Sequence, residues 1–132
     1  MLIKHILKHS YFWLVASLFV SFAITYLSFM DTDGLPSVSI PHADKYVHFV
    51  EYFVFFVVWF MYLYTTYKKS FLLTSFFAFL TVVFFGIIIE VLQGTLTDHR
   101  TFDWGDVLFN SLGALTSFVL LFVLALSLKR FK

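Results

Sequence analysis

Polar side chains that could carry chemistry stand near the ends of long apolar runs in this sequence. His48 lies close to the start of one run, Glu90 close to the end of the next, and Asp106 directly before another. An imidazole titrates near neutral pH and is the commonest general acid or base, and a carboxylate can share that role. If the protein is an enzyme, which the sequence leaves undecided, we predict that His48, Glu90 and Asp106 are its catalytic residues.

Around His48 the polar residues recur at helical spacing. Asp44, His48 and Tyr52 stand at i, i+4 and i+8, so a helix places them on one face, with Lys45 and Glu51 beside them. Asp44 lies shortly after a proline and could simply cap the N-terminus of this helix, which would stabilise it by about 1 kcal/mol. Capping and ligand binding both remain open for Asp44.

Glu90 and Gln93 close the next apolar run. An acid at the centre of a lipid-embedded helix costs roughly 2.5 to 3.5 kcal/mol, and less near the helix end. We therefore expect Glu90 to face the bundle interior and to have a partner there. The alternative is that its side chain reaches the lipid headgroups.

A stripe of polar and small residues runs along the last apolar segment. At i, i+4, i+7 and i+11 it has Asp106, Asn110, Gly113 and Ser117. Small residues allow two membrane helices to approach closely, and an asparagine can hydrogen-bond across their contact. Helix packing alone is the alternative to a functional role for this stripe.

Three segments thus bring polar residues to one predicted level, which suits the binding of a polar head group. Lys45 and Arg100 supply positive charge for a phosphate or carboxylate, and the nearby acids and amides could orient these bases. The residues that we predict to bind a ligand are Asp44, Lys45, Tyr52, Gln93, Arg100 and Asn110.

The segments that must position these residues are membrane helices. Of 132 residues, 61% are hydrophobic and 13% charged, which is more apolar surface than a soluble domain of this size could bury. We predict one all-α domain over residues 1–132, an integral membrane bundle of four transmembrane helices at about 11–29, 46–67, 71–92 and 107–128. We expect the first to be retained rather than cleaved as a signal peptide, because its charge-free run is long and no small-residue cleavage site follows.

The basic residues predict how these helices are oriented. Seven of the nine lysines and arginines fall at the termini or between the second and third helices, whereas all eight acids lie in or near the other two loops. Cytoplasmic loops are enriched in lysine and arginine. Both termini are therefore predicted to be cytoplasmic, and the polar residues to face outward.

Composition excludes several other kinds of site. Without cysteine the chain has no disulfide and no thiolate metal ligand. A net charge of +1 without a basic stripe argues against nucleic acid as a partner, and neither a phosphate-binding glycine loop nor a nucleophile elbow occurs. We predict no cofactor, and in the absence of H-E-x-x-H or paired histidines a metal site stays unassigned.

Four ordered blocks of residues resemble the VanZ-like family. They are Asp44-Lys45-x-x-His48-Phe49-x-x-Tyr52, Glu90-x-x-Gln93, Arg100, and Asp106-x-x-x-Asn110-x-x-Gly113. Where that family often has a glycine, this chain has Ser117, which is a mild departure. The resemblance implies a multi-pass protein of the bacterial plasma membrane with a role in the cell envelope. The family is named for a protein associated with low-level resistance to the lipoglycopeptide teicoplanin, and the resemblance supplies no reaction.

Several functions fit these residues, and we favour the first. In it, the outward site binds or processes an amphiphile, such as a lipid-linked cell-wall precursor or a lipoglycopeptide, among membrane lipids. In the second, His48, Glu90 and Asp106, with His99, hold the metal ion of a membrane enzyme. In the third, Glu90 couples proton or ion transport in a small carrier that acts as an oligomer, although such sites usually lie near the membrane midplane. A structural or assembly role is a further alternative, and the oligomeric state is not predicted.

Overall fold

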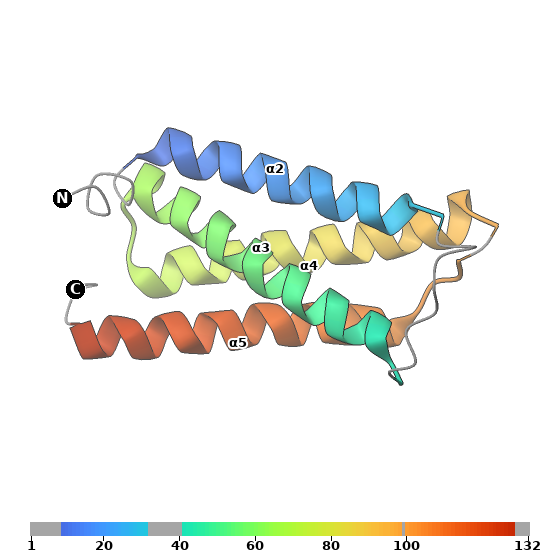
Figure 1. Cartoon of the computed structure of the whole chain (residues 1–132). Coiled ribbons are helices and arrows are strands. Elements are labelled where there is room, and N and C mark those ends of the chain that lie inside the picture. The colour runs from blue at the N-terminus through green and yellow to red at the C-terminus, as the bar shows by residue number, and fades with distance from the viewer. Residues whose placement is uncertain (1–8, 32–40, 99, 129–132) are drawn as a thin grey trace.

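The computed structural model describes residues 9–31, 41–98 and 100–128. All regular structure in these residues is helical, and Figure 1 shows the four helices α2 (Ser10–Phe29), α3 (Ala43–Tyr67), α4 (Phe71–Leu96) and α5 (Trp104–Leu128). Each helix is long and apolar enough to cross a membrane. The prediction of an all-α fold with four helices of membrane-spanning length is therefore confirmed.

The helices extend beyond the apolar runs that predicted them. α3 begins at Ala43 rather than at residue 46, α4 ends at Leu96 rather than at 92, and α5 begins at Trp104 rather than at 107. Hydropathy marks where side chains meet lipid, whereas the backbone hydrogen bonds of a helix continue into polar sequence. The extra turns all lie on the polar side and carry part of the candidate site.

The interpretation of Asp44 as an N-cap is wrong. The residue at the cap position of α3 is His42, which has the left-handed backbone angles φ 57° and ψ 31° and makes no side-chain cap bond. Asp44 lies inside the first turn of α3 instead. There its carboxylate still complements the positive end of the helix dipole.

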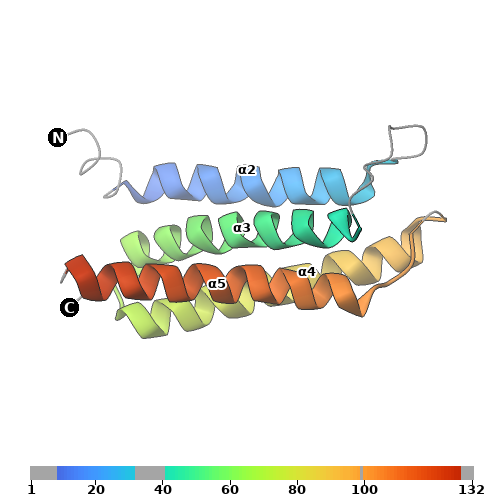
Figure 2. The same cartoon turned by 60° about the horizontal axis from the view of Figure 1, so that its bottom comes forward.

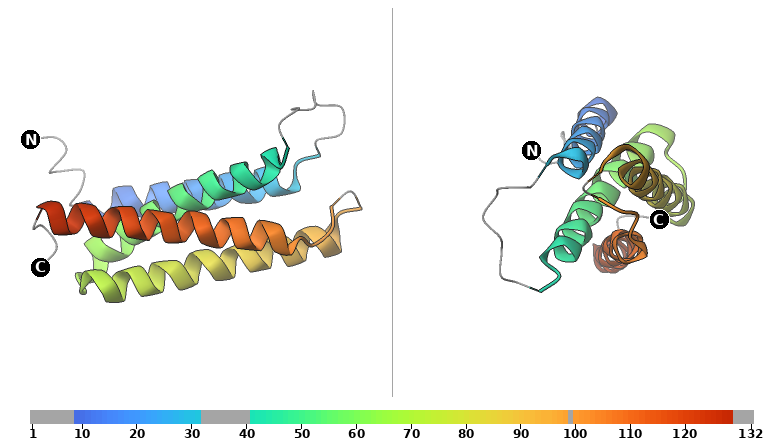
Figure 3. Two further views of the ribbon diagram at one scale, coloured as in Figure 1. Left: turned by 90° about the horizontal axis from the view of Figure 1, so that it is seen from below. Right: turned by 90° about the vertical axis from the view of Figure 1, so that its right-hand side faces the viewer.

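Consecutive helices run in opposite directions, and α3 lies at the centre of the bundle. It contacts each of the other three helices, whereas α2 contacts α4 more lightly than it contacts α3. Figure 2 shows the antiparallel order, and the end-on view in Figure 3 shows α2, α4 and α5 around α3. The start of α3, the end of α4 and the start of α5 therefore meet at one end of the bundle.

The interior is aromatic, and the outer surface is also apolar. Phe55, Phe56 and Phe60 of α3 are fully buried at the bundle centre. Large apolar side chains such as Phe19 and Phe84 are exposed on the outside. A soluble protein of this size does not expose so much contiguous apolar surface, so lipid is the solvent for this face.

Helices α3 and α5 approach so closely that a glycine is required at their contact. A Cβ atom built on Gly113 would overlap the carbonyl oxygen of Phe49 and lie 3.0 Å from the backbone nitrogen of Phe53. One turn further along α5, the buried Ser117 hydroxyl donates a hydrogen bond of 2.8 Å to the Phe53 carbonyl. Small residues thus bring the two backbones together, as they do in many membrane helix pairs.

Replacing Ser117 by alanine should destabilise the bundle slightly, by about 0.6 kcal/mol, which is the average for hydrogen bonds between membrane helices. The matched control is Ser127→Ala, because the exposed Ser127 hydroxyl bonds only to Val123 of its own helix. Thermal or denaturant unfolding in detergent would measure both. A Ser117→Ala variant that is no less stable than the control would contradict a stabilising interhelical bond.

Candidate functional site

Two buried side chains and one partly buried side chain, from three helices, come together at the polar end of the bundle. His48 lies on the second turn of α3, Glu90 near the end of α4, and Asp106 on the first turn of α5. One nitrogen or oxygen atom of each lies within 4.8 Å of the others. His48 is 7% exposed and Glu90 1%, and the Asp106 side chain is 14% exposed. The fold thus brings together the three residues that we predicted to be catalytic.

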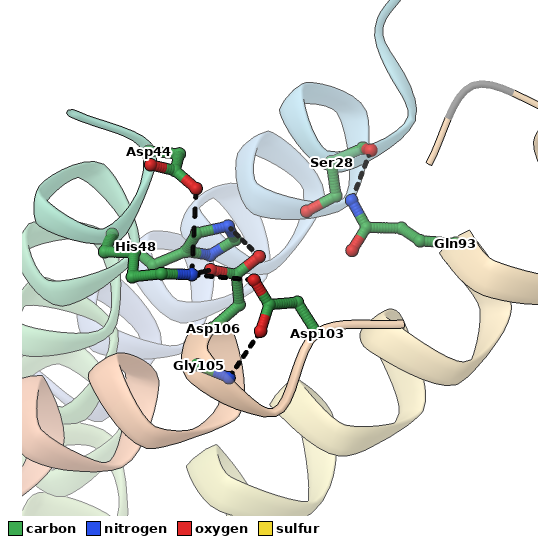
Figure 4. A network of polar contacts seen from close by, with 8 residues as sticks. Ser28, Asp44, His48, Gln93, Asp103, Gly105 and Asp106 are labelled. Carbon is green, nitrogen blue, oxygen red and sulfur yellow. Dashed lines mark hydrogen bonds and ion pairs between the residues drawn. The ribbon is translucent and has the colours of Figure 1, made fainter. Parts of the chain in front are cut away.

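Lys45 connects this cluster to the loop before α5. Its Nζ donates to Asp103 Oδ2 at 2.7 Å and to Asp106 Oδ1 at 2.9 Å, and it lies 3.8 Å from Asp44 Oδ2 (Figure 4). The other oxygen of Asp106, Oδ2, lies 3.5 Å from His48 Nε2. The Asp106 carboxylate therefore stands between a lysine and a histidine.

Asp103 is a member of the cluster that the sequence reasoning missed as a site residue. The ammonium of Lys45 donates to it, and the Gly105 backbone N–H donates to its Oδ1 at 2.6 Å. The lysine first, and then this backbone bond, hold the pKa of the Asp103 carboxyl below its usual range. An acid just before a helix is readily explained by its favourable interaction with the helix N-terminus, which is why Asp103 was not predicted as a site residue. Its i, i+3 spacing from Asp106 was nevertheless a usable signal, because that spacing lets one lysine reach both carboxylates.

A second polar layer lies one helical turn deeper in the bundle. Tyr52 follows His48 by four residues, and Asn110 follows Asp106 by four. Gly86 precedes Glu90 by four, and a Cβ atom on it would lie 2.9 Å from the Tyr52 ring and 3.2 Å from Asn110 Nδ2. The absence of a side chain at Gly86 leaves room for Tyr52 and Asn110 beneath the cluster.

Both layers contain buried polar atoms without a hydrogen-bond partner in the described part of the chain. These atoms are His48 Nδ1, Tyr52 Oη, Glu90 Oε1, and Asn110 Oδ1 and Nδ2. Leaving such a group unpaired costs about 1–3 kcal/mol, so natural proteins rarely tolerate several together. A cluster of unsatisfied groups at one place is typical of a site that receives a ligand, an ion or ordered water.

The remaining residues predicted to bind a ligand lie around the cluster or away from it. Asp44 is exposed at its rim. Arg100 is partly exposed and makes no ion pair within 4.0 Å among residues 9–31, 41–98 and 100–128, although it interacts electrostatically with Glu51 and Glu90. Gln93 points away, donating a 2.6 Å hydrogen bond to the Ser28 carbonyl of α2 (Figure 4).

Gln93 therefore has a structural contact between α4 and α2 that the sequence did not predict. His99, the additional metal ligand suggested in the sequence analysis, lies outside the described residues.

The cluster could act in two chemical ways. An imidazole beside two carboxylates can accept, hold and donate a proton. One imidazole nitrogen and two carboxylate oxygens from three helices could also hold a metal ion, through His48, Glu90 and Asp106.

Four helices of membrane-spanning length with a buried polar cluster at one end define a multi-pass membrane protein. The chain belongs to the VanZ/LLP1 family, whose model matches residues 3–125. The resemblance seen in the sequence is thus confirmed over nearly the whole chain. Comparisons with curated proteins and with solved structures gave no match.

Proposed function

We propose that this protein acts in the cell envelope from the bacterial plasma membrane, where its outward-facing cluster binds the polar head of an amphiphile. The observation that carries the proposal is the group of unpartnered polar atoms buried at one end of an apolar bundle. A ligand with both a polar head and an acyl chain would satisfy these atoms while its chain stays in lipid. The excess of basic residues near both termini supports a cytoplasmic location for them and an outward cluster.

The chemistry of the cluster favours a head that carries both hydroxyl or amine donors and an anionic group. Glu90 and Asn110 offer buried acceptor oxygens, which suit the hydroxyl and amine groups of a sugar-peptide head. Arg100, at the rim, can pair with a phosphate or carboxylate. Lipid-linked cell-wall precursors and lipoglycopeptides such as teicoplanin both combine these groups with an acyl or prenyl chain.

A carrier function is less well supported than head-group binding. The cluster lies within the first turns of α3 and α5, at one end of the bundle. Alternating access requires a site near the middle of the membrane, reachable from both sides in turn.

Teicoplanin susceptibility in cells that produce the protein tests this proposal. The wild-type protein should raise the inhibitory concentration, and His48→Ala, Glu90→Gln and Asp106→Asn should each return it to the value for cells without the protein. The control is Thr95→Ala on α4, because the exposed Thr95 hydroxyl bonds only within its own helix. Resistance equal to wild type in all three variants, at equal amounts of protein in the membrane, would refute the site.

A further inference from the structure

We infer that His48, Glu90 and Asp106 form a binding site for one divalent transition-metal ion, such as Zn²⁺ or Mn²⁺. The three side chains offer one imidazole nitrogen and two carboxylate oxygens, and these atoms lie within 4.8 Å of one another. The inference concerns the same cluster as the proposed head-group site, but it does not depend on an amphiphile being bound.

The spacing of the three side chains suits a small metal ion. Zinc bonds to nitrogen and oxygen are about 2.0–2.2 Å long, so two ligand atoms on a tetrahedral ion lie about 3.4 Å apart. His48 Nε2 and Asp106 Oδ2 are already 3.5 Å apart, which is long for a hydrogen bond but close to this value. A ligand oxygen of Glu90 lies within 4.8 Å of both other ligand atoms.

The buried carboxylate of Glu90 gives independent support. Its Oε1 is fully buried and has no hydrogen-bond partner within the described residues. A buried carboxylate oxygen needs a proton or a cation, because the free energy of leaving it unpaired is large. Within the described part of the chain, the Lys45 ammonium forms ion pairs with Asp44, Asp103 and Asp106 and none with Glu90, so it does not neutralise Glu90.

The charge of the cluster also calls for a cation. Two bases lie in or beside it, Lys45 and Arg100. Five acids surround them: Asp44, Glu51, Glu90, Asp103 and Asp106. Acidic groups thus outnumber basic ones around the cluster, and a bound dication would offset part of this excess. Lys45 occupies Oδ1 of Asp106 and leaves Oδ2 for the metal.

The donor set selects the class of metal and leaves a coordination position open. Imidazole favours zinc and other transition metals, whereas carboxylates alone suit calcium and magnesium, so a mixed set points to Zn²⁺ or Mn²⁺. Three protein ligands leave a fourth position for water or a ligand, as in catalytic zinc sites. Tyr52 and Asn110 lie one turn deeper with unpartnered polar atoms and could hydrogen-bond to a group there.

Calorimetric titration of the full chain in detergent tests the site directly. The protein, purified without a polyhistidine tag and stripped with EDTA, is titrated with ZnCl₂ and, separately, with MnCl₂. We expect one ion of at least one metal per chain. His48→Ala, Glu90→Gln and Asp106→Asn should each weaken binding by about 100-fold. The control His42→Asn removes an exposed imidazole near the start of α3.

No binding of either metal by the wild-type protein would overturn the inference. So would binding that is weakened by His42→Asn but not by the three cluster variants, because it would then come from surface imidazoles. Glu90→Gln and Asp106→Asn preserve side-chain shape, and an unchanged helical circular dichroism spectrum and elution volume show that they fold. Because the titration contains no lipid-linked precursor or lipoglycopeptide, its failure would remove the metal site and leave head-group binding standing.

Discussion

Gly113→Leu should prevent α5 from packing on α3 and lower the stability of the bundle by about 3 kcal/mol or more. Overpacking a membrane or soluble core usually costs 1–3 kcal/mol, and here the obstacle is backbone rather than a movable side chain. The Cβ atom alone would overlap the Phe49 carbonyl oxygen and crowd the Phe53 nitrogen. Relief requires the helices to separate, which would also break the Ser117 bond to Phe53.

Unfolding in detergent, followed by circular dichroism, measures this effect. Gly113→Ala should fall between the wild type and Gly113→Leu, because it adds only the first of the clashing atoms. Thr116→Leu is the control, since Thr116 lies on the same helix, is exposed, and accepts extra bulk toward lipid. A Gly113→Leu protein as stable as Thr116→Leu would mean that α3 and α5 do not approach closely in this region.

Hydropathy was sufficient to predict the four helices, because each must bury its backbone polar groups in lipid and only a helix does so within one segment. It could not predict the helix ends on the polar side. The first turn of α3 and the last of α4 are polar, so they leave no hydropathy signal although they are helical. The left-handed backbone conformation of His42 was likewise not predictable, because a positive φ is uncommon for any residue other than glycine, even though histidine adopts it more often than most.

The part of the candidate site that depends only on helical spacing was predictable, because spacing determines which face of a helix a residue lies on. His48, Glu90 and Asp106 stand on three separate helices, yet each points inward because a polar side chain at this depth avoids lipid. Partners across helices were not predictable. Gln93 bonds to a backbone carbonyl of α2, and a carbonyl acceptor carries no sequence signal. The i, i+3 spacing of Asp103 from Asp106 was visible in the sequence, but its partner on α3, Lys45, was not.

The arrangement of the polar residues in two layers explains why an apolar bundle tolerates them. α3 and α5 each add a polar side chain to both layers at a four-residue step, while α4 adds Glu90 to the first layer and the space at Gly86 to the second. The cluster therefore occupies two turns at one end and leaves the aromatic centre apolar. The polar groups are buried from lipid by the neighbouring helices rather than by a covering domain.

Lys45→Met should lower the stability of the bundle by about 2 kcal/mol, because the Lys45 ammonium pairs with the carboxylates of both Asp103 and Asp106. An exposed ion pair contributes at most about 1 kcal/mol, whereas breaking a buried one costs about 3–5 kcal/mol. The Lys45 and Asp106 side chains are 17% and 14% exposed, while Asp103 is 47% exposed. We therefore expect a loss of stability between the values for an exposed and a buried ion pair. Methionine keeps roughly the length and the apolar stem of lysine and removes its ammonium, and with it both the charge and the hydrogen-bond donors.

The pairing itself is isolated by a double-mutant cycle with Asp106→Asn. If Lys45 and Asp106 interact as the 2.9 Å contact indicates, the double variant loses less stability than the sum of the two single variants, by about 1 kcal/mol or more. Lys69→Met, an exposed lysine at the opposite end of the bundle, controls for the change in net charge. Strictly additive losses would show that the Lys45–Asp106 pair does not stabilise the bundle, so that the effect of Lys45→Met comes from its bond to Asp103 or from packing. A positive coupling energy would show that its charge holds the start of α5 against α3, which is what aligns Asp106 with His48 and Glu90.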